Sequence, residues 1–499
     1  MLPCEVKWLV DCQPRAVQQE ALLRSFYGWK SRENRHDDPN PVRIHEGPAI
    51  GWGHFLEMRL GKTPTSLNEM LLLRDEYGFK KHVVLAPNSF KKMWVKEAQT
   101  FGVDIPFFAY ETSRGNEAVK FIEANNAGEF CLVVNYEALQ YDNTRDILKW
   151  VIDKDCTLTA DESIKLKNPN SITFKRALEH SKEAGILREL SGCPITQGPQ
   201  DMYAQLRFIR MLSGKNFYSF RNRYCKMGGF KGKKIVGAKN EGELQEIISS
   251  GGFIAKRKDW GNPHDSEHYI TELEIAPEQK KHYEAMDEEF ITFLDDGREV
   301  TVDQVISKMM KLQQISSGFL YAEKSEAVSL MDIKQTPKMK KLLEIMEDEV
   351  ESKTIICYHY GYSGDALLES LSKYNPAVIR GRGWMKKNDR DVEAEKERFN
   401  NDPDCRIMIL QISAGKYGHT LTGVEKDRCN LMIFYEGTYS YDDRIQIEMR
   451  NTAAFQDWCN VYMDFVISEA ERNAIKALRK KENLVEAVLG AYERKKTID

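Results

Sequence analysis

The sequence lacks several features that would place the chain outside the ordinary globular proteins. Its 499 residues contain no run of about eighteen or more apolar residues, so we expect no membrane span. The N-terminus, MLPCEVKWLVDCQPR, has neither a basic start followed by an apolar core nor a small-residue cleavage site. There is no internal repeat or low-complexity tract. We therefore expect a cytoplasmic protein of about two to four domains.

Metal and disulfide chemistry have little support in this composition. The ten cysteines are scattered, none forms a C-x-x-C pair, and no histidine has the spacing of a metal ligand. Cysteines such as Cys131 and Cys357 lie within apolar runs. We interpret them as reduced, buried thiols rather than as a zinc site or a disulfide framework.

Positive and negative charges nearly balance over the whole chain, but one segment carries positive charge alone. The formal net charge of −4 predicts nothing about polyanions. Residues 207–239, called the basic segment below, contain ten Lys or Arg and no Asp or Glu, and aromatic residues are interleaved with them. This pattern is expected where a nucleic-acid backbone binds, although a solvated helix face could carry the same charges.

Short apolar runs alternate with helical patterns in two parts of the chain. This alternation predicts two α/β lobes with parallel sheets, joined by a largely helical middle. We expect an N-terminal lobe over residues 1–205, a helical, basic insertion and linker over 206–330, and a C-terminal lobe over 331–499. The strand candidates are residues 82–87, 130–136 and 157–162 in the first lobe and 353–359, 375–381, 405–411 and 429–435 in the second.

A candidate phosphate-binding loop lies between a predicted amphipathic helix, residues 13–27, and the first of these strand candidates. Gly61, Lys62 and Thr63 supply what such a loop needs: a helix N-terminus, a lysine for the outer phosphates and a hydroxyl for magnesium. The strict pattern also requires glycine where this chain has Leu56. By itself the tripeptide is equally compatible with an ordinary helix start.

An acidic pair follows at the end of a later strand candidate. Asp161 could hold the magnesium that bridges the outer phosphates, and Glu162 could orient and deprotonate the attacking water. An isolated Asp-Glu pair usually only starts a loop, but its combination with Gly-Lys-Thr on one sheet favours catalysis. The turn beginning at Ser191, in LSGCPIT, is suited to coupling this site to neighbouring elements.

In this order, the motifs resemble those of the Snf-type ATPases of helicase superfamily two, including compact bacterial and phage members. RAVQQEAL is similar to the glutamine motif, and LEMRLGKT, VVLAPNSFKKMWVKEAQTF, VVNYEAL, ADESIKLKNPNS and LSGCPIT follow it. KTIICYH, ISAGKYGHTLTG and DDRIQIEMRNTAAFQ resemble the fourth, fifth and sixth motifs. The resemblance spans nearly the whole chain.

The resemblance implies two RecA-like P-loop lobes that bind ATP and Mg²⁺ between them, a duplex DNA partner and a monomeric motor. It implies catalytic roles for Lys62, Asp161, Glu162 and Arg450, with Thr63 and Asp161 on the magnesium. ATP contacts are expected from Gln18, Arg59, Gly61, Lys62, Thr63, Gly418 and Arg450, and DNA contacts from Asn88, Ser89, Asn135, Tyr136, Ser413, Thr422, Arg221 and Arg223.

Three positions depart from the family pattern. Arg59 replaces a glycine of the loop, and its guanidinium could contact the nucleotide instead. Ile164 stands where the family has a histidine. Ala453 occupies the position of the second arginine of the sixth motif, a finger worth on the order of a thousandfold or more in rate. Either Arg450 or Arg444 substitutes for that finger, or hydrolysis is slow.

We therefore predict a DNA-stimulated ATPase that translocates along double-stranded DNA in the cytoplasm of a bacterium or a phage-infected host cell. One alternative is a DNA-binding module with weak or lost ATPase activity, which Ala453 supports. Another is an RNA-directed helicase. Repair, recombination, replication and defence or counter-defence all remain possible pathways.

Overall fold

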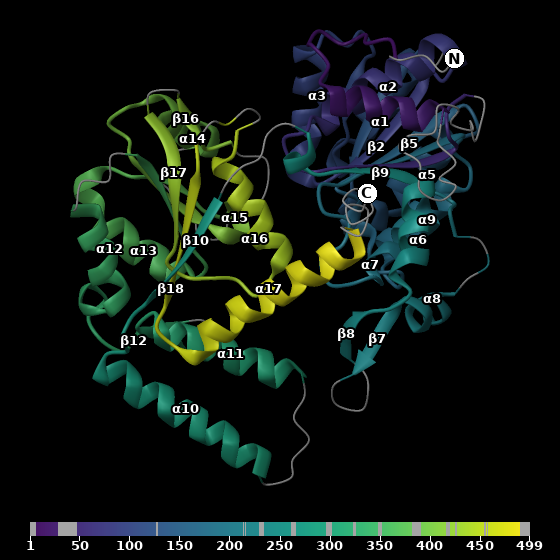
Figure 1. The fold of residues 1–499 in the computed structure, drawn as a ribbon. Coiled ribbons are helices and arrows are strands. Elements are labelled where there is room, and N and C mark those ends of the chain that lie inside the picture. The colour runs from purple at the N-terminus through teal and green to yellow at the C-terminus, as the bar shows by residue number, and fades with distance from the viewer. Residues whose placement is uncertain are drawn as a thin grey trace, which may run out of the picture. The chain divides into compact units, whose positions relative to one another are not determined.

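The structure is a computed structural model in which the chain forms two compact units (Figure 1). The second unit spans His264–Lys480, and the first unit comprises the rest. No helix of the described residues is long and apolar enough to cross a membrane, and every described cysteine is a free thiol. The structure describes residues 6–27, 47–125, 128–212, 214, 216–228, 234–260, 266–295, 302–322, 326–347, 352–381, 391–415, 420–424, 427–453, 456 and 458–489.

The first unit is built on a seven-stranded sheet in the order β3-β4-β2-β5-β6-β1-β9, in which all pairs are parallel. Its central strands are short and buried along nearly their whole length, as expected for a parallel sheet between helices, and two of them, β2 and β4, are largely apolar. The residues that follow the strands meet at one edge of the sheet, where ligands of such sheets bind. The strands are β1 Gly51–Leu56, β2 Lys81–Ala86, β3 Phe107–Ala109, β4 Phe130–Asn135, β5 Cys156–Asp161, β6 Ile186–Leu190 and β9 Gly252–Ala255.

Helices connect these strands. The first of them, α1, packs Val17 and Ala21 against β1 and β9, and Leu22 and Phe26 against the second helix. This packing places the start of α1 beside the loop that follows β1. The helices of this unit are α1 Ala16–Tyr27, α2 Lys62–Tyr77, α3 Lys91–Thr100, α4 Gly115–Asn125, α5 Asp142–Val151, α6 Ile172–Ser181, α7 Asp201–Phe208, α8 Phe217–Tyr224 and α9 Glu241–Ser250.

The middle of the chain contains strands that the sequence did not predict. Strand β9 completes the first sheet, and β10 (Ser266–Glu272) is an edge strand of the second. The basic segment forms α8 and a separate antiparallel hairpin of β7 (Cys225–Gly228) and β8 (Lys234–Ala238). The three-part division by residue range stays a prediction.

A buried polar cluster fixes α2 to the first sheet. Glu69 of α2 lies 2.8 Å from Nε2 of His54 on β1 and 2.8 Å from Nε of Arg188 on β6, and it accepts a hydrogen bond of 2.8 Å from Ser25 of α1. Burial raises the pKa of Glu69, but the charges and hydrogen bonds of Arg188 and His54 outweigh it and hold this pKa at about 2. The four side chains therefore join two helices and two strands through one ionised carboxylate.

Removing the arginine of this cluster is expected to destabilise the first unit strongly. In Arg188→Gln the charge of Glu69 would stay buried without its main counter-charge, which costs about 3–5 kcal/mol of unfolding free energy. Urea unfolding would measure the loss. The matched control is Arg176→Gln, which removes partly exposed ion pairs with Asp142 and Glu179 and should cost about 1 kcal/mol or less. Equal losses in the two variants would contradict the expectation.

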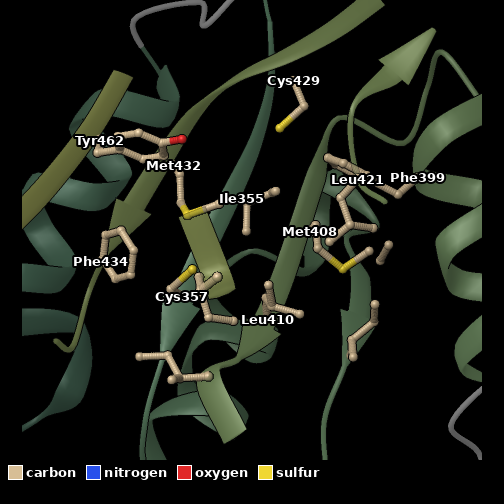
Figure 2. Packing of buried hydrophobic residues seen from close by; sticks show 14 of the residues in the cluster. Ile355, Cys357, Phe399, Met408, Leu410, Leu421, Cys429, Met432, Phe434 and Tyr462 are labelled. Atoms are coloured by element: carbon tan, nitrogen blue, oxygen red, sulfur yellow. The ribbon is translucent and has the colours of Figure 1, made fainter. Parts of the chain in front are cut away.

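The second unit contains a parallel sheet in the order β10-β18-β17-β13-β15-β14, with the short β16 antiparallel to β17. Side chains alternate along each strand. Ile355 and Cys357 of β13 join one core cluster, which Figure 2 shows, while Ile356 and Tyr358 join another. The sheet therefore separates two hydrophobic layers. The strands not yet given are β13 Lys353–Tyr358, β14 Ala377–Ile379, β15 Ile407–Gln411, β16 Gly423–Val424, β17 Asp427–Phe434 and β18 Asn460–Val466.

Helices and one further hairpin complete the second unit. The hairpin pairs β11 with β12 in antiparallel register. These elements are α10 Pro277–Asp295, α11 Val302–Ser316, β11 Phe319–Tyr321, β12 Ala327–Ser329, α12 Pro337–Glu347, α13 Gly361–Ser370, α14 Val392–Asn401, α15 Ile412–Gly415, α16 Tyr441–Glu448 and α17 Glu469–Leu489.

Candidate active site

The loop between β1 and α2 has the backbone of an anion-binding turn. Gly61 has φ +88° and is the N-cap residue of α2, and as a glycine it has no side chain of its own to occupy the first N–H groups of the helix. The N–H groups of the first turn can therefore point at a ligand. Arg59 also has a positive φ, of +70°. Glycine adopts a left-handed conformation without strain. The loop therefore has, at Arg59, the backbone conformation expected of the glycine that this arginine replaces.

Gln18 braces this loop from α1. Its Nε2 donates a hydrogen bond of 3.2 Å to the carbonyl of Gly61, and its Oε1 accepts one of 2.7 Å from the backbone N–H of Arg15. A Cβ at position 61 would lie 2.3 Å from Gln18 Nε2, so another residue there would displace the Gln18 amide and would also strain the left-handed backbone. These bonds use one N–H and one lone pair of the Gln18 amide, and its contact with adenine stays a prediction.

Lys62 and Asp161 lie at the same edge of the sheet. The Lys62 ammonium donates a hydrogen bond of 3.1 Å to the carbonyl of Leu56, where the loop begins. A Cβ on Gly192, in the turn after β6, would lie 3.2 Å from this ammonium, so the glycine leaves it room. The charge of Lys62 also acts on Asp161, where it opposes the burial that raises the pKa of this carboxyl. The structure therefore brings together the lysine and the aspartate that the sequence assigned to one site.

Asp161, the last residue of β5, is buried and held in a fixed orientation. Its Oδ2 accepts a hydrogen bond of 2.8 Å from the indole N–H of Trp94, and its backbone carbonyl accepts one of 2.7 Å from the hydroxyl of Tyr136. Burial raises the pKa of the Asp161 carboxyl to about 6, against the opposing influence of Trp94 and Lys62. The next residue, Glu162, is also buried and has φ +53°. A left-handed non-glycine residue directly after the strand is a conformation typical of functional sites.

Glu97 of α3 extends the cluster toward the loop. It accepts a hydrogen bond from the Thr63 hydroxyl and interacts electrostatically with Arg59, while its burial raises the pKa of its carboxyl. Hydroxyl and carboxylate oxygens are the protein ligands that Mg²⁺ prefers. The side chains of Thr63 and Asp161 therefore fit a magnesium site, with Trp94 and Glu97 as the residues that position them.

Hydrogen bonds connect the segment that directly follows the acidic pair to the turn after β6. The Ser163 hydroxyl donates to Gln205 Oε1 at 2.8 Å, and Gln205 Nε2 donates to the carbonyl of Pro194 at 2.7 Å. The Lys167 ammonium donates to the Thr196 hydroxyl at 2.9 Å. The coupling expected for the LSGCPIT turn therefore has a physical route, although it runs through Pro194 and Thr196 rather than through Ser191.

The sixth-motif residues of the second unit have different surroundings. The Arg444 guanidinium donates to Asp464 and Glu448, and its carbon lies 3.5 Å from the centroid of the Phe434 ring. These contacts hold the Arg444 side chain in the core of its unit. We therefore do not expect Arg444 to replace the arginine finger that is missing at Ala453. Arg450 is buried and donates to the carbonyl of Gln446 at 2.6 Å. Gly418 lies outside the described residues.

The residues expected to contact DNA are not equally accessible. Asn88 and Ser89, which follow β2, are exposed, and so is Ser413 in α15. Asn135 is buried and bonded to Lys91 and Glu137. Tyr136 is likewise buried, with its hydroxyl on the backbone of β5. Thr422 is half-buried.

The two arginines of the basic segment also differ. Arg223 forms an ion pair with Glu243, whose carboxylate lies 2.9 Å from the arginine Nε. Arg221 lies 5.3 Å from the ring centroid of Tyr218, which is 65% exposed. An exposed aromatic ring with an arginine stacked on it is the better candidate for nucleic-acid contact, because the charge of Arg223 is already paired. Residues 213, 215 and 229–233 of the segment lie outside the described residues.

Comparison with known proteins places the chain in a family. A family model described as "SNF2-related domain" matches residues 6–318. The chain is 23% identical over 400 residues to the SWI/SNF-related matrix-associated actin-dependent regulator of chromatin subfamily A-like protein 1 of Xenopus laevis, a match that covers 79% of this chain and 37% of that protein. It is 22% identical over 467 residues to the ATP-dependent helicase FUN30 of Saccharomyces cerevisiae, covering 78% of this chain and 40% of that protein.

A phage protein and a solved structure are also similar. Protein p41 of Acyrthosiphon pisum secondary endosymbiont phage 1 is 21% identical over 412 residues, covering 78% of this chain and 82% of p41. The SWI2/SNF2 ATPase core of Sulfolobus solfataricus in complex with dsDNA is 18% identical with a TM-score of 0.41, covering 97% of this chain and 96% of that one. The chain spans less than half the length of the frog and yeast relatives. Since the family model covers more than half of its residues, the chain belongs to the SNF2-related family.

Proposed function

We propose that this chain hydrolyses ATP with Mg²⁺ and uses the reaction to translocate along double-stranded DNA. The observation that carries the proposal is the grouping of Lys62, Thr63 and Asp161 at one edge of the first sheet. A helix N-terminus, a lysine and an Mg²⁺-type carboxylate are the parts that phosphoryl transfer from a nucleoside triphosphate requires. Membership of the SNF2-related family supports the same reaction.

Each side chain of the group has a distinct part in this reaction. The N–H groups at the start of α2 and the Lys62 ammonium bind phosphate oxygens. Thr63 and Asp161 would hold Mg²⁺, which would neutralise phosphate charge. Glu162 orients the attacking water and accepts its proton. From the second unit, Arg450 is the proposed contact with the nucleotide.

Duplex DNA is proposed as the track because exposed polar and basic side chains accompany the nucleotide site. Asn88 and Ser89 follow β2, which adjoins β5 and therefore ends beside Asp161. Arg221 and the exposed ring of Tyr218 add a basic, aromatic surface in the same unit. Backbone contacts of these kinds bind DNA without reading its sequence, as a translocase requires.

A Lys62→Ala variant tests the motor. We expect the wild-type protein to release phosphate from ATP in the presence of Mg²⁺ and duplex DNA, and the variant to lose at least about 99% of this activity, since it lacks the charge that binds the outer phosphates. A phosphate-release assay with duplex DNA, single-stranded DNA or duplex RNA would measure both. Wild-type turnover no higher than that of Lys62→Ala would overturn the proposal. Stimulation by RNA alone would show that duplex DNA is not the polymer on which the protein acts.

A DNA-binding module without a motor is the second candidate, and Ala453 is the observation that favours it. Its signature is DNA binding that is unaffected by ATP, together with phosphate release at the level of the Lys62→Ala control. An electrophoretic mobility assay with and without ATP would identify it.

A further inference from the structure

A second arginine lies beside the phosphate loop, and the sequence did not single it out. Arg257 follows β9, which pairs with β1 so that Ala255 lies opposite Leu56. The backbone N–H of Arg257 donates a hydrogen bond of 2.8 Å to the carboxylate of Glu57, the first residue of the loop. The topology therefore places Arg257 at the sheet edge where β1 runs into Gly61 and Lys62.

The guanidinium of Arg257 is buried without full hydrogen bonding. The residue is 8% exposed, and neither Nε nor Nη1 has a hydrogen-bond acceptor among the residues that the structure describes. Nε lies 3.4 Å from Glu57 Oε1, a charge contact that does not satisfy the geometry of a hydrogen bond. Unsatisfied buried donors on a charged group are costly. An acceptor that binds at this place would remove the cost.

Arg59 brings a second positive charge to the same place. Its backbone stays in the left-handed region, and its guanidinium interacts with both Arg257 and Glu97. Burial, and after it the charge of Arg257, lowers the pKa of Arg59. Two guanidinium groups that repel each other in a poorly solvated site favour the binding of an anion between them.

We infer that Arg59 and Arg257 form a clamp for the phosphate chain of the bound nucleotide, so that Arg257 is a nucleotide-binding residue of the first unit. This inference rests on the proposed function. A guanidinium offers two parallel N–H donors that match phosphate oxygens. A nucleotide phosphate is favoured over a DNA phosphate because Arg59 belongs to the loop that ends in Gly61 and Lys62, and because its other partner, Glu97, bonds the Thr63 hydroxyl.

Nucleotide affinity tests the clamp without requiring turnover. The dissociation constants of Mg²⁺ complexes of ADP and of a non-hydrolysable ATP analogue would be measured by calorimetry on the full chain. In Arg257→Gln we expect binding of the ATP analogue to weaken by about ten- to a hundredfold, as for a lost hydrogen bond to a charged group. Arg257→Lys should recover part of the loss. Arg59→Gly, which keeps the left-handed backbone without the charge, should weaken binding as well.

Glu57→Gln gives an effect of opposite sign, which structural damage would not produce. Removing this negative charge beside Arg257 should tighten binding of the ATP analogue several-fold, on the order of 1 kcal/mol at a partly exposed site. Arg114→Gln, which removes an exposed arginine of the same unit, is the control and should bind as the wild type does.

The outcomes separate the clamp from the proposed function. If the wild type binds and Lys62→Ala does not, but Arg257→Gln and Glu57→Gln both bind like the wild type, the clamp is wrong and the proposed function stands. If Arg257→Gln weakens duplex DNA binding and leaves nucleotide affinity unchanged, the clamp is likewise wrong. If the wild type binds no nucleotide, the proposed function itself fails.

Discussion

Glu162→Gln is expected to lower ATP turnover by a factor on the order of 10²–10⁴ while leaving nucleotide affinity nearly unchanged. The substitution keeps the size of the side chain and removes the base. Glu162 is buried and directly follows Asp161, and its left-handed backbone conformation sets the direction in which its side chain leaves the chain. Loss of proton transfer therefore affects the rate of the chemical step and not the binding of the phosphates. Phosphate release and calorimetric binding on the same preparation would show the separation.

The control for this variant is Glu183→Gln, an exposed carboxylate of the same unit, which should hydrolyse ATP at the wild-type rate. If Glu162→Gln also hydrolysed ATP at that rate, Glu162 would not be the base. A variant that lost nucleotide binding and turnover together would point instead to collapse of the site around Asp161, and Asp161→Asn would then be needed for comparison.

Ala453→Arg is expected to raise turnover by a factor on the order of 10³, the contribution of an arginine finger. The position is half-buried, and the Ala453 backbone N–H donates to Gln456 Oε1 at 3.1 Å, a bond that does not involve the side chain to be replaced. Arg444 cannot perform this part, because Asp464 and Glu448 hold it in the core. The remaining candidate is Arg450.

Steady-state phosphate release at saturating ATP and duplex DNA would measure the gain. Ala453→Met is the matched control, since it adds side-chain length without charge and should leave turnover unchanged. If Ala453→Arg did not change turnover while Arg450→Ala abolished it, Arg450 alone would be sufficient as the arginine finger. The expectation that Ala453 slows hydrolysis would then be wrong.

The sheets could be predicted wherever apolar residues run continuously. β2, β4, β13, β15 and β17 contain such runs, and these strands, like β5 with its alternating threonines, lie within a few residues of the predicted ranges. β6 could not be found in this way because its sequence, ILREL, contains Arg188 and Glu189. Arg188 is tolerated only because Glu69, more than a hundred residues away in the chain, meets it in the core. Compensation across such a distance is invisible to a local pattern.

The same limit applies to the site. Lys62, Thr63, Asp161 and Glu162 belong to recognisable motifs, and the structure places them at one edge of one sheet. Glu97 lies within the motif VVLAPNSFKKMWVKEAQTF, but the motif alone does not indicate that this carboxylate is a partner of Thr63. Arg257 was not predicted because its position depends on β9. This strand has only four residues, and its apolar run is too short to be recognised as a strand from the sequence. The signal that could have found it was the pairing of β9 with β1, which only the folded chain provides.

The brace between Gln18 and Gly61 has a consequence for selectivity. One amide holds the carbonyl of the phosphate loop, and the same amide is the group predicted to meet the base. The Gln18 Nε2 group has a second N–H, so a base can accept from it while the first N–H still holds Gly61. Binding of the base and the position of the phosphate loop then act on the same amide and are coupled in free energy. A base that turns this amide away would therefore also weaken the hold of the loop on the phosphates.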